Sequence, residues 1–295
     1  MRRKFYTVLE AGTKSLIIVP ENTRVVPLQA EGTRAPFYMI DSFPYFIDVV
    51  SLLGPDQPVL SIIGHEDMMA DSYSIADEAA QHVQTILEHQ PAGPYMLGGC
   101  SASGIVAYET AQQLHALGRK VSKLVLFDTP NPYYMREYSA LWMSLNSYRE
   151  DLHRMGISEI PAWVIMKFKK LISKQISGLE YGSLPLNGGR DQMGPSEIRI
   201  RAARKYRPAS YEGSVILFRR YRELVGRYLD PQFGWGTAVR GDVEICQSNA
   251  LDHLEIFKSE LDRLTIARVL RKHFDQVFAS SPNSGETARN HLTLN

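Results

Sequence analysis

The sequence predicts an α/β fold in which a mostly parallel central sheet carries helices on both faces. Apolar runs of strand length recur along the chain, and amphipathic helical patterns separate several of them. Strands that alternate with helices are typical of parallel sheets, because each helix covers the sheet as the chain crosses back. With 295 residues, of which 44% are hydrophobic, the chain can bury a large core, either as one domain with an insertion or as two small domains.

The expected strands are short apolar segments. They lie near residues 36–40, 58–63, 95–99, 121–127, 215–218 and 243–246. Between the second and third of these segments, Ser74 begins a helix, since its hydroxyl can cap the first turn while Asp77 reaches back. The apolar stripe of this helix consists of Ile75, Ala79, Val83 and Ile86. The last segment contains Cys246, which we expect to be buried in its strand.

Two further segments show helical spacing of apolar residues. The helix after residue 101 has a stripe of Ala107, Ala111, Leu114 and Leu117. A final helix, which begins at Ser259, has a stripe of Ile266, Leu270, Phe274 and Val277. We treat residues 1–25 as an N-terminal extension and expect the polar residues 279–295 to form a disordered tail.

Residues 97–109 predict the most informative local structure of the chain. Their sequence, LGGCSASGIVAYE, indicates a strand, a tight turn and a helix, with Ser101 at the apex of the turn. Such a nucleophile elbow holds the backbone in a strained conformation, so small residues are needed two positions before and two after the apex. Gly99 and Ser103 occupy these positions. The usual motif has glycine at the second, and here Gly104 follows one residue later.

Two later residues fit the partners that such a serine needs. Asp128 ends the apolar run 123–127, where Pro130 prevents the strand from continuing, and parallel strands deliver functional residues at their carboxyl ends. His253 lies in a loop between an expected strand and an expected helix. His253 would accept the serine proton, and Asp128 would orient the imidazole. A turn serine, a capping aspartate and a surface histidine are the alternative interpretations.

Four blocks of the chain, in this order, resemble the thioesterase domains that end nonribosomal peptide and polyketide synthases. The blocks are residues 90–101, 124–129, 204–208 with 211–213, and 251–253. The resemblance extends over about residues 26–278 and implies the α/β-hydrolase fold with a catalytic triad of Ser101, Asp128 and His253. It also implies release of an acyl or peptidyl chain from the phosphopantetheine thioester of a carrier protein, by hydrolysis or cyclisation.

The resemblance also implies that residues 131–194 form a helical lid over a substrate channel. This interval contains two amphipathic helical patterns, at 137–155 and 161–177, and an ordinary helical excursion is the alternative. Its apolar residues either line an acyl channel or fill a core: Met135, Trp142, Met143, Trp163 and Met166. Cys100 also fits the frame of small residues around a nucleophile, but alignment with the family pattern puts Ser101 at the apex.

The chain departs from the family pattern after the first core strand. Histidine and glycine, or two prolines, often stand there, whereas this chain has DSFPYF at 41–46. An oxyanion hole needs two N–H donors, and Ala102, the residue after the nucleophile, is expected to supply one. Pro44 has no N–H, so we expect the second donor to be Phe43, with Ser42 as the next choice.

Composition narrows the classes of function. A formal net charge of +1 argues against electrostatic binding of nucleic acid, and two cysteines indicate no disulfide framework. We find no secretory signal, and no stretch approaches the roughly 18 apolar residues of a membrane span. We therefore expect a cytoplasmic protein without cofactor or metal, and the sequence does not predict its oligomeric state.

The expected partner is an acyl or peptidyl carrier protein. Basic residues could steer such an acidic partner, and a solvated helix face explains them equally well. They are Lys167, Lys169, Lys170, Arg199, Arg201, Arg204 and Lys205. Two other functions stay open, an esterase or acyltransferase that uses the same triad on a small ester or thioester, and a catalytically idle module that binds carriers.

Overall fold

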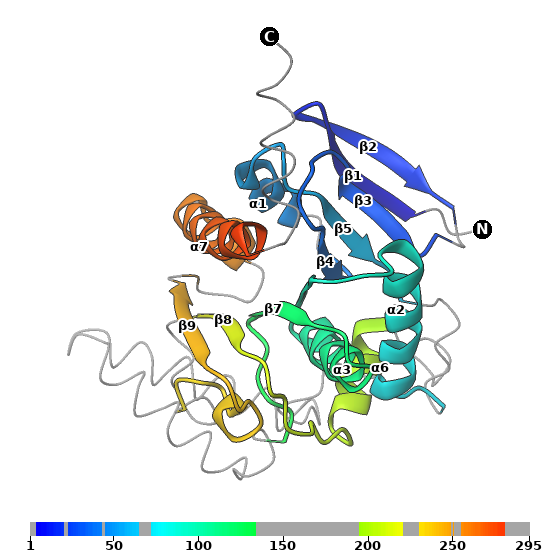
Figure 1. The fold of residues 1–295 in the computed structure, drawn as a ribbon, viewed down its shortest axis with the longest axis vertical. Helices are drawn as coiled ribbons and strands as arrows, with labels where there is room; N and C mark the ends of the chain where they lie inside the picture. Colours follow the sequence, from blue (N-terminus) through cyan, green and yellow to red (C-terminus); the bar gives the residue numbers. More distant parts are fainter. Residues whose placement is uncertain are drawn as a thin grey trace, which may run out of the picture.

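The computed structural model describes residues 4–20, 23–42, 45–64, 72–133, 195–220, 230–248, 250 and 255–280. Within these residues nine strands form one mixed sheet, in the order β2-β1-β3-β5-β4-β6-β7-β8-β9 (Figure 1). The strands are β1 (Lys4–Glu10), β2 (Thr13–Val19), β3 (Val25–Gln29), β4 (Phe37–Ile40), β5 (Val59–Ile62), β6 (Tyr95–Cys100), β7 (Val121–Phe127), β8 (Val215–Arg220) and β9 (Val243–Ser248). Every neighbouring pair from β5 to β9 is parallel, which confirms the predicted sheet.

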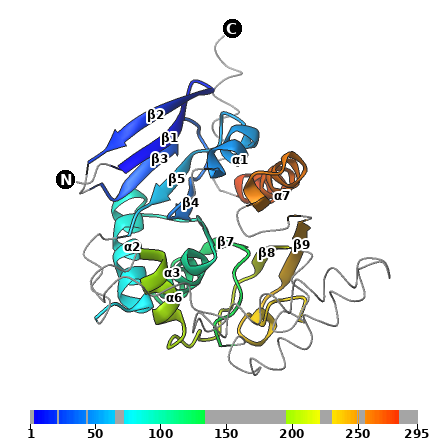
Figure 2. The same ribbon diagram turned by 180° about the vertical axis from the view of Figure 1, so that it is seen from behind.

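Helices cover both faces of this sheet, as Figures 1 and 2 show from opposite sides. The helices are α1 (Phe46–Leu53), α2 (Ile75–His89), α3 (Ala102–Ala116), α6 (Pro195–Ala203) and α7 (Glu260–Ala279), with short 3₁₀ turns η5 (Trp235–Thr237) and η6 (Glu255–Phe257). Helices α1 and α7 pack together on one face, and α2, α3 and α6 on the other. Among the described residues, none of these helices is both long and apolar enough to cross a bilayer.

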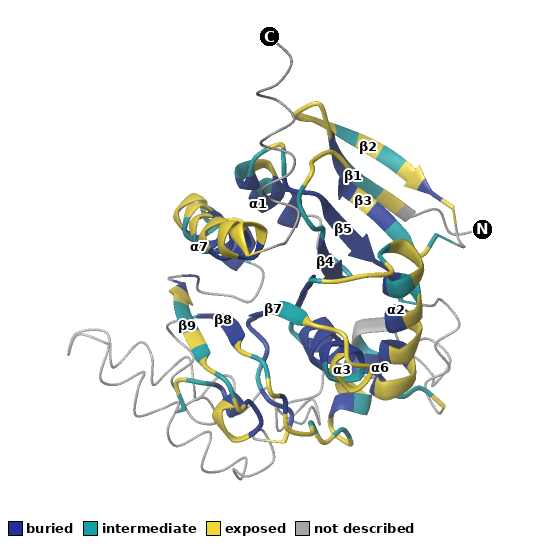
Figure 3. Cartoon of the chain, in the orientation of Figure 1, coloured by how far each residue is buried: buried dark blue, intermediate teal, exposed yellow. Residues whose placement is uncertain are grey.

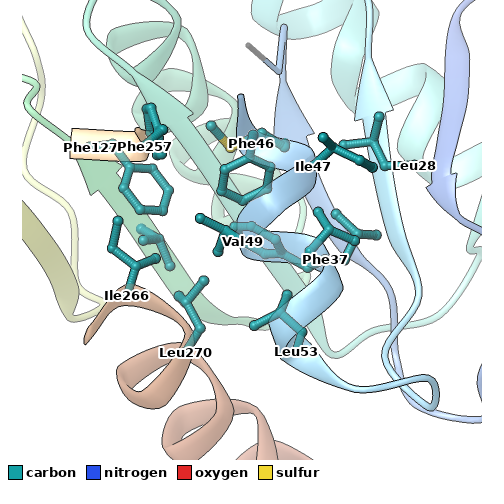
Figure 4. Close-up of a cluster of buried hydrophobic side chains, with 14 of the residues drawn as sticks. Leu28, Phe37, Phe46, Ile47, Val49, Leu53, Phe127, Phe257, Ile266 and Leu270 are labelled. Atoms are coloured by element: carbon teal, nitrogen blue, oxygen red, sulfur yellow. The ribbon is translucent and has the colours of Figure 1, made fainter. Parts of the chain in front are cut away.

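Strand alternation divides the interior into two cores. In β4, Phe37 and Met39 point into the core beneath α1 and α7, whereas Tyr38 and Ile40 point into the core beneath α2 and α3. Figure 4 shows the first core, where Phe46 of α1 lies edge-on to Phe127 of β7. Figure 3 shows the strands between the layers buried, with exposed residues on the outer faces of α2 and α7.

The serines at 74 and 259 predicted two helix starts, and the apolar patterns predicted the buried stripes with one exception. The Ser74 hydroxyl accepts hydrogen bonds from the N–H groups of Ala76 and Asp77, and Ser259 caps α7 in the same way. Leu117 is the exception, because it is 59% exposed. Helix α3 ends one residue earlier, and Gly118 at φ 70° turns the chain away, so Leu117 never joins the stripe.

The N-terminal 25 residues contain a hairpin that the sequence analysis did not find. Strands β1 and β2 pair antiparallel, with Phe5 opposite Ile18, and β1 lies beside β3. The sheet therefore continues into the segment that we treated as an extension. The other predicted regions, the lid at 131–194 and the tail at 279–295, lie outside the described residues except at 131–133 and 279–280.

Candidate active site

Ser101 lies on the joint between β6 and α3, in the conformation that a nucleophile elbow requires. Its φ of 55° and ψ of −122° are rarely adopted by residues other than glycine, and such backbone strain costs about 1–3 kcal/mol. The turn is held on both sides. The Ser101 N–H donates to the carbonyl of Phe127 at 2.9 Å, and the Ser101 carbonyl accepts from the Gly104 N–H at 3.1 Å.

Two glycines permit this turn, each for a different steric reason. A Cβ on Gly99 would lie 2.7 Å from the carbonyl carbon of Ser103, because the first turn of α3 passes directly over β6. A Cβ on Gly104 would lie 2.8 Å from Cγ2 of Thr129, which follows β7. Ser103 is tolerated in the place of the usual glycine, and its side chain is buried. Gly104 therefore serves the packing of α3 against β7.

The residue before the apex has the wrong environment for a nucleophile. Cys100 is the last residue of β6 and is 1% exposed. Burial raises the pKa of its thiol well above the ordinary value, and the negative charge of Asp128 raises it further. The thiolate is the reactive form of cysteine, so this environment disfavours it. Ser101, in contrast, is partly exposed on the turn.

Asp128 emerges level with Ser101 on the next strand. Cys100 of β6 pairs with Phe127 of β7, so the residues that follow them leave the same edge of the sheet together. Asp128 has a φ of 45° and is 3% exposed, and its N–H donates to the carbonyl of Phe218 at 2.7 Å. The structure thus brings two of the three predicted triad residues to neighbouring strand ends.

Arg220 is a neighbour of Asp128 that the sequence analysis missed. Its Nε donates to Asp128 Oδ2 at 2.7 Å, from the end of β8, the strand beside β7. This charge-assisted bond fixes the rotation of the carboxylate. The sequence contained one signal for this residue, because Arg220 follows a predicted parallel strand. Asp128 itself was predicted from the same kind of position.

Two predicted site residues, His253 and Phe43, lie outside the described residues. The segments on either side of His253 fit the predicted loop between a strand and a helix, because β9 ends at Ser248 and η6 begins at Glu255. Strand β9 is parallel to β8, so the chain leaves it at the edge where Ser101 and Asp128 stand.

The described oxyanion candidates, Ala102 and Ser42, differ in availability. Ala102 is the first residue of α3, and the first N–H groups of a helix have no partner within the helix. The Ser42 N–H donates to Ser61 Oγ at 3.1 Å, and the two hydroxyls lie 2.9 Å apart. Ser42 is therefore already engaged, which disfavours our second choice for the other donor.

One predicted surface residue is buried. Arg199 was grouped with the basic residues of a carrier-binding face, but it is 3% exposed and pairs with Asp41 and Glu78. The sequence analysis grouped Arg199 with Arg201, Arg204 and Lys205 by charge alone, although Ile198 and Ile200 flank it. Arg201, Arg204 and Lys205 are exposed, whereas the three lysines at 167–170 lie outside the described residues.

The chain is similar to known proteins in sequence and in fold. Residues 51–172 match the family model for the thioesterase domain. The non-reducing polyketide synthase crz7 of Cladonia metacorallifera is 33% identical over 136 residues, which cover 46% of this chain and 6% of the synthase. The chain thus spans only a small part of the length of this relative.

Two solved structures share the fold. The NocB thioesterase domain, in a covalent complex with a fluorophosphonate nocardicin G analogue, has a TM-score of 0.53 at 22% identity, covering 84% of this chain and 98% of that domain. A four-domain nonribosomal peptide synthetase has a TM-score of 0.58 at 18% identity, covering 86% and 20%. The predicted α/β-hydrolase fold is confirmed. Residues 51–172 of this chain thus match the model of a hydrolase family, the thioesterase domain, and the chain is homologous to a short segment of polyketide synthases.

Proposed function

We propose that the chain releases an acyl or peptidyl chain from the phosphopantetheine thioester of a carrier protein. The observation that carries the proposal is the strained turn at Ser101, with Asp128 level with it on the neighbouring strand. The match to the thioesterase domain and the homology to polyketide synthases supply the class of substrate.

The proposed reaction has two stages. Ser101 Oγ attacks the thioester carbonyl while His253 accepts its proton, and Asp128 holds the imidazole in one tautomer and stabilises its charged form. The oxyanion accepts hydrogen bonds from the Ala102 N–H and from a second donor, for which Phe43 is our candidate. Collapse breaks the carbon–sulfur bond, and His253 returns the proton to the departing thiol. Water or a nucleophile within the acyl chain then attacks the ester carbonyl while His253 accepts its proton. The bond between the acyl carbon and Ser101 Oγ breaks, and His253 passes the proton to Oγ, which gives hydrolysis or cyclisation and restores Ser101.

The proposed partner is a carrier protein in the cytoplasm. The phosphopantetheine belongs to that partner, so the enzyme itself needs no cofactor in this mechanism. Exposed basic side chains of α6 and the turn after it are suited to an acidic carrier: Arg201, Arg204 and Lys205. For residues 131–194 we retain the hypothesis of a lid over the acyl chain.

Labelling combined with turnover tests this function. We expect a fluorophosphonate to modify Ser101, located by peptide mass spectrometry, and a panel of acyl-pantetheine thioesters to yield free acid or cyclic product. The Ser101→Ala variant, the matched control, should do neither. A wild-type protein that is folded but takes no label would instead indicate an idle carrier-binding module. Labelled protein that cleaves oxoesters and leaves every thioester intact would indicate an esterase.

A further inference from the structure

A buried ionic cluster joins three elements at the carboxyl edge of the sheet. Arg199 of α6 donates from Nε to both carboxylate oxygens of Glu78 on α2, at 2.9 and 3.2 Å, and its Nη2 also bonds Glu78. Its Nη1 pairs with Asp41, the residue that follows β4. Arg199 and Glu78 are each less than 5% exposed, so the guanidinium is fixed between two carboxylates away from bulk water.

Neighbouring residues contact the cluster and leave room for it. The hydroxyl of Tyr73 donates to Glu78, and the N–H of Gly64 donates to Asp41 Oδ1 at 3.3 Å. A Cβ on Gly64 would overlap both Arg199 Nη2 and Glu78 Oε1, so only glycine leaves room for the ion pair here. Because these contacts come from several elements, the charged groups of the cluster are held in defined positions.

The two buried members of the cluster, Arg199 and Glu78, are held in their charged forms. Burial acts to lower the pKa of Arg199, but attraction by Asp41 and Glu78 outweighs it and raises the pKa. Burial acts to raise the pKa of Glu78, but hydrogen bonds and charge attraction from Arg199, and then from His82, outweigh it and lower the pKa. The buried pair of Arg199 and Glu78 is therefore ionised throughout the neutral range.

The third member, Asp41, follows β4, the strand beside the one that leads to Ser101. Strands β4 and β6 are parallel, with Ile40 opposite Gly99, so the turn at Asp41 and Ser42 runs alongside Cys100 and Ser101. Asp41 has a φ of 42°, a strained conformation for a residue other than glycine, and its N–H donates to the carbonyl of Ile62. Its ion pair to Arg199 is a contact that holds this turn from outside the sheet.

We propose that Arg199 is a positioning residue, which through Asp41 fixes the turn after β4 against the nucleophile turn, while Glu78 aims the guanidinium. The proposal rests on the function proposed above, because it matters only if Ser101 reacts. In the proposed mechanism the second oxyanion donor comes from the chain that follows Asp41, so a displaced turn at Asp41 and Ser42 would misplace that donor. The loss should then appear in the reaction of bound substrate.

A purely structural ion pair is the competing explanation, and Asp41→Asn separates the two. Asp41 is 25% exposed, so the amide is tolerated, and the buried pair between Arg199 and Glu78 stays intact. The matched control is Asp56→Asn. Asp56 precedes β5 at the opposite edge of the sheet, where its carboxylate accepts from Thr33 and from Arg34.

The experiment measures three quantities on each folded variant. They are kcat and KM for an acyl-pantetheine thioester, and the rate at which a fluorophosphonate modifies Ser101, whose transition state also places an oxygen in the oxyanion hole. For Asp41→Asn we expect kcat to fall by up to about 10²-fold, with little change in KM and a parallel loss of labelling rate. Asp56→Asn should match wild type in all three. Arg199→Lys keeps the charge but not the forked geometry, and Gly64→Ala crowds the pair, so both should resemble Asp41→Asn.

Each result is decisive for one proposal. If Asp41→Asn and Arg199→Lys are folded and label as fast as wild type, Arg199 positions nothing and the inference is wrong. A loss of thermal stability with unchanged labelling would leave the cluster a structural feature only. If wild type labels at Ser101 but releases no thioester, the proposed function fails, while the labelling rates still decide the role of Arg199.

Discussion

At Ser101, backbone conformation and side-chain chemistry favour the same nucleophile. The strained turn presents the hydroxyl, whereas burial raises the pKa of the neighbouring Cys100 thiol. Ser101→Ala should lower kcat by about 10⁶-fold if the triad acts as a unit, and Cys100→Ala should keep most of the activity. Steady-state kinetics check both variants. An acyl label recovered on Cys100 would contradict the assignment.

Asp128 carries the second prediction at this scale. Asp128→Asn should fold normally and lose about 10⁴-fold in kcat, because the amide favours the wrong tautomer of the histidine. Arg220→Gln should cost less, since it loosens the carboxylate without removing it. Circular dichroism checks that both variants fold, and steady-state kinetics measure the kcat of each. Asp252 is the carboxylate next to His253 in the sequence. A comparable loss in Asp252→Asn, with Asp128→Asn fully active, would move the acid to Asp252.

At the scale of elements, the joint of β6, α3 and β7 depends on Gly104. Helix propensity alone would make Gly104→Ala stabilising by up to about 1 kcal/mol. The methyl would press on Thr129, however, so we expect a destabilisation of about 1–3 kcal/mol instead. Urea denaturation gives the sign directly. A more stable Gly104→Ala protein would show that α3 does not pack as tightly against β7 as described.

The periodicity of apolar residues predicted the helices and strands around the site, but it did not predict the ion pairs between them. The predicted strands from 36 to 246 became β4 to β9, because buried parallel strands are continuous apolar runs that stand out locally. The hairpin of β1 and β2 was missed although β2 ends in the apolar run LIIV, and its side chains Phe5, Leu16 and Ile18 remain exposed. The ion pairs of Arg199 and Arg220 join residues about 90 to 160 positions apart, and no local pattern encodes them.

For the whole molecule, the buried carboxylate of Glu78 links stability to pH. Its pKa lies below the ordinary value of 4.5 in the folded state, so the unfolded chain takes up a proton first as the solution becomes acidic. The free energy of unfolding should therefore decrease below about pH 5, by up to about 1.4 kcal/mol per pH unit from this group. Glu78→Gln should flatten this dependence.

Urea denaturation between neutral and acidic pH measures the slope. Glu88→Gln is the matched control, because Glu88 lies on the same helix and is exposed. It should keep the wild-type slope although it removes one carboxylate. Equal slopes in Glu78→Gln and wild type would mean that the cluster does not keep Glu78 ionised in acid.

The hairpin of β1 and β2 at the sheet edge determines which N-terminal truncations of the protein remain soluble. A fragment that starts at residue 26 would lose β1 and β2, together with the buried side chains of Val8, Leu9 and Val19. Strand β3 would then offer open backbone groups, a template on which other copies can add strands. We expect light scattering to show such a fragment aggregating, while the full chain stays dispersed. A fragment as soluble and as heat-resistant as the full chain would make the hairpin dispensable.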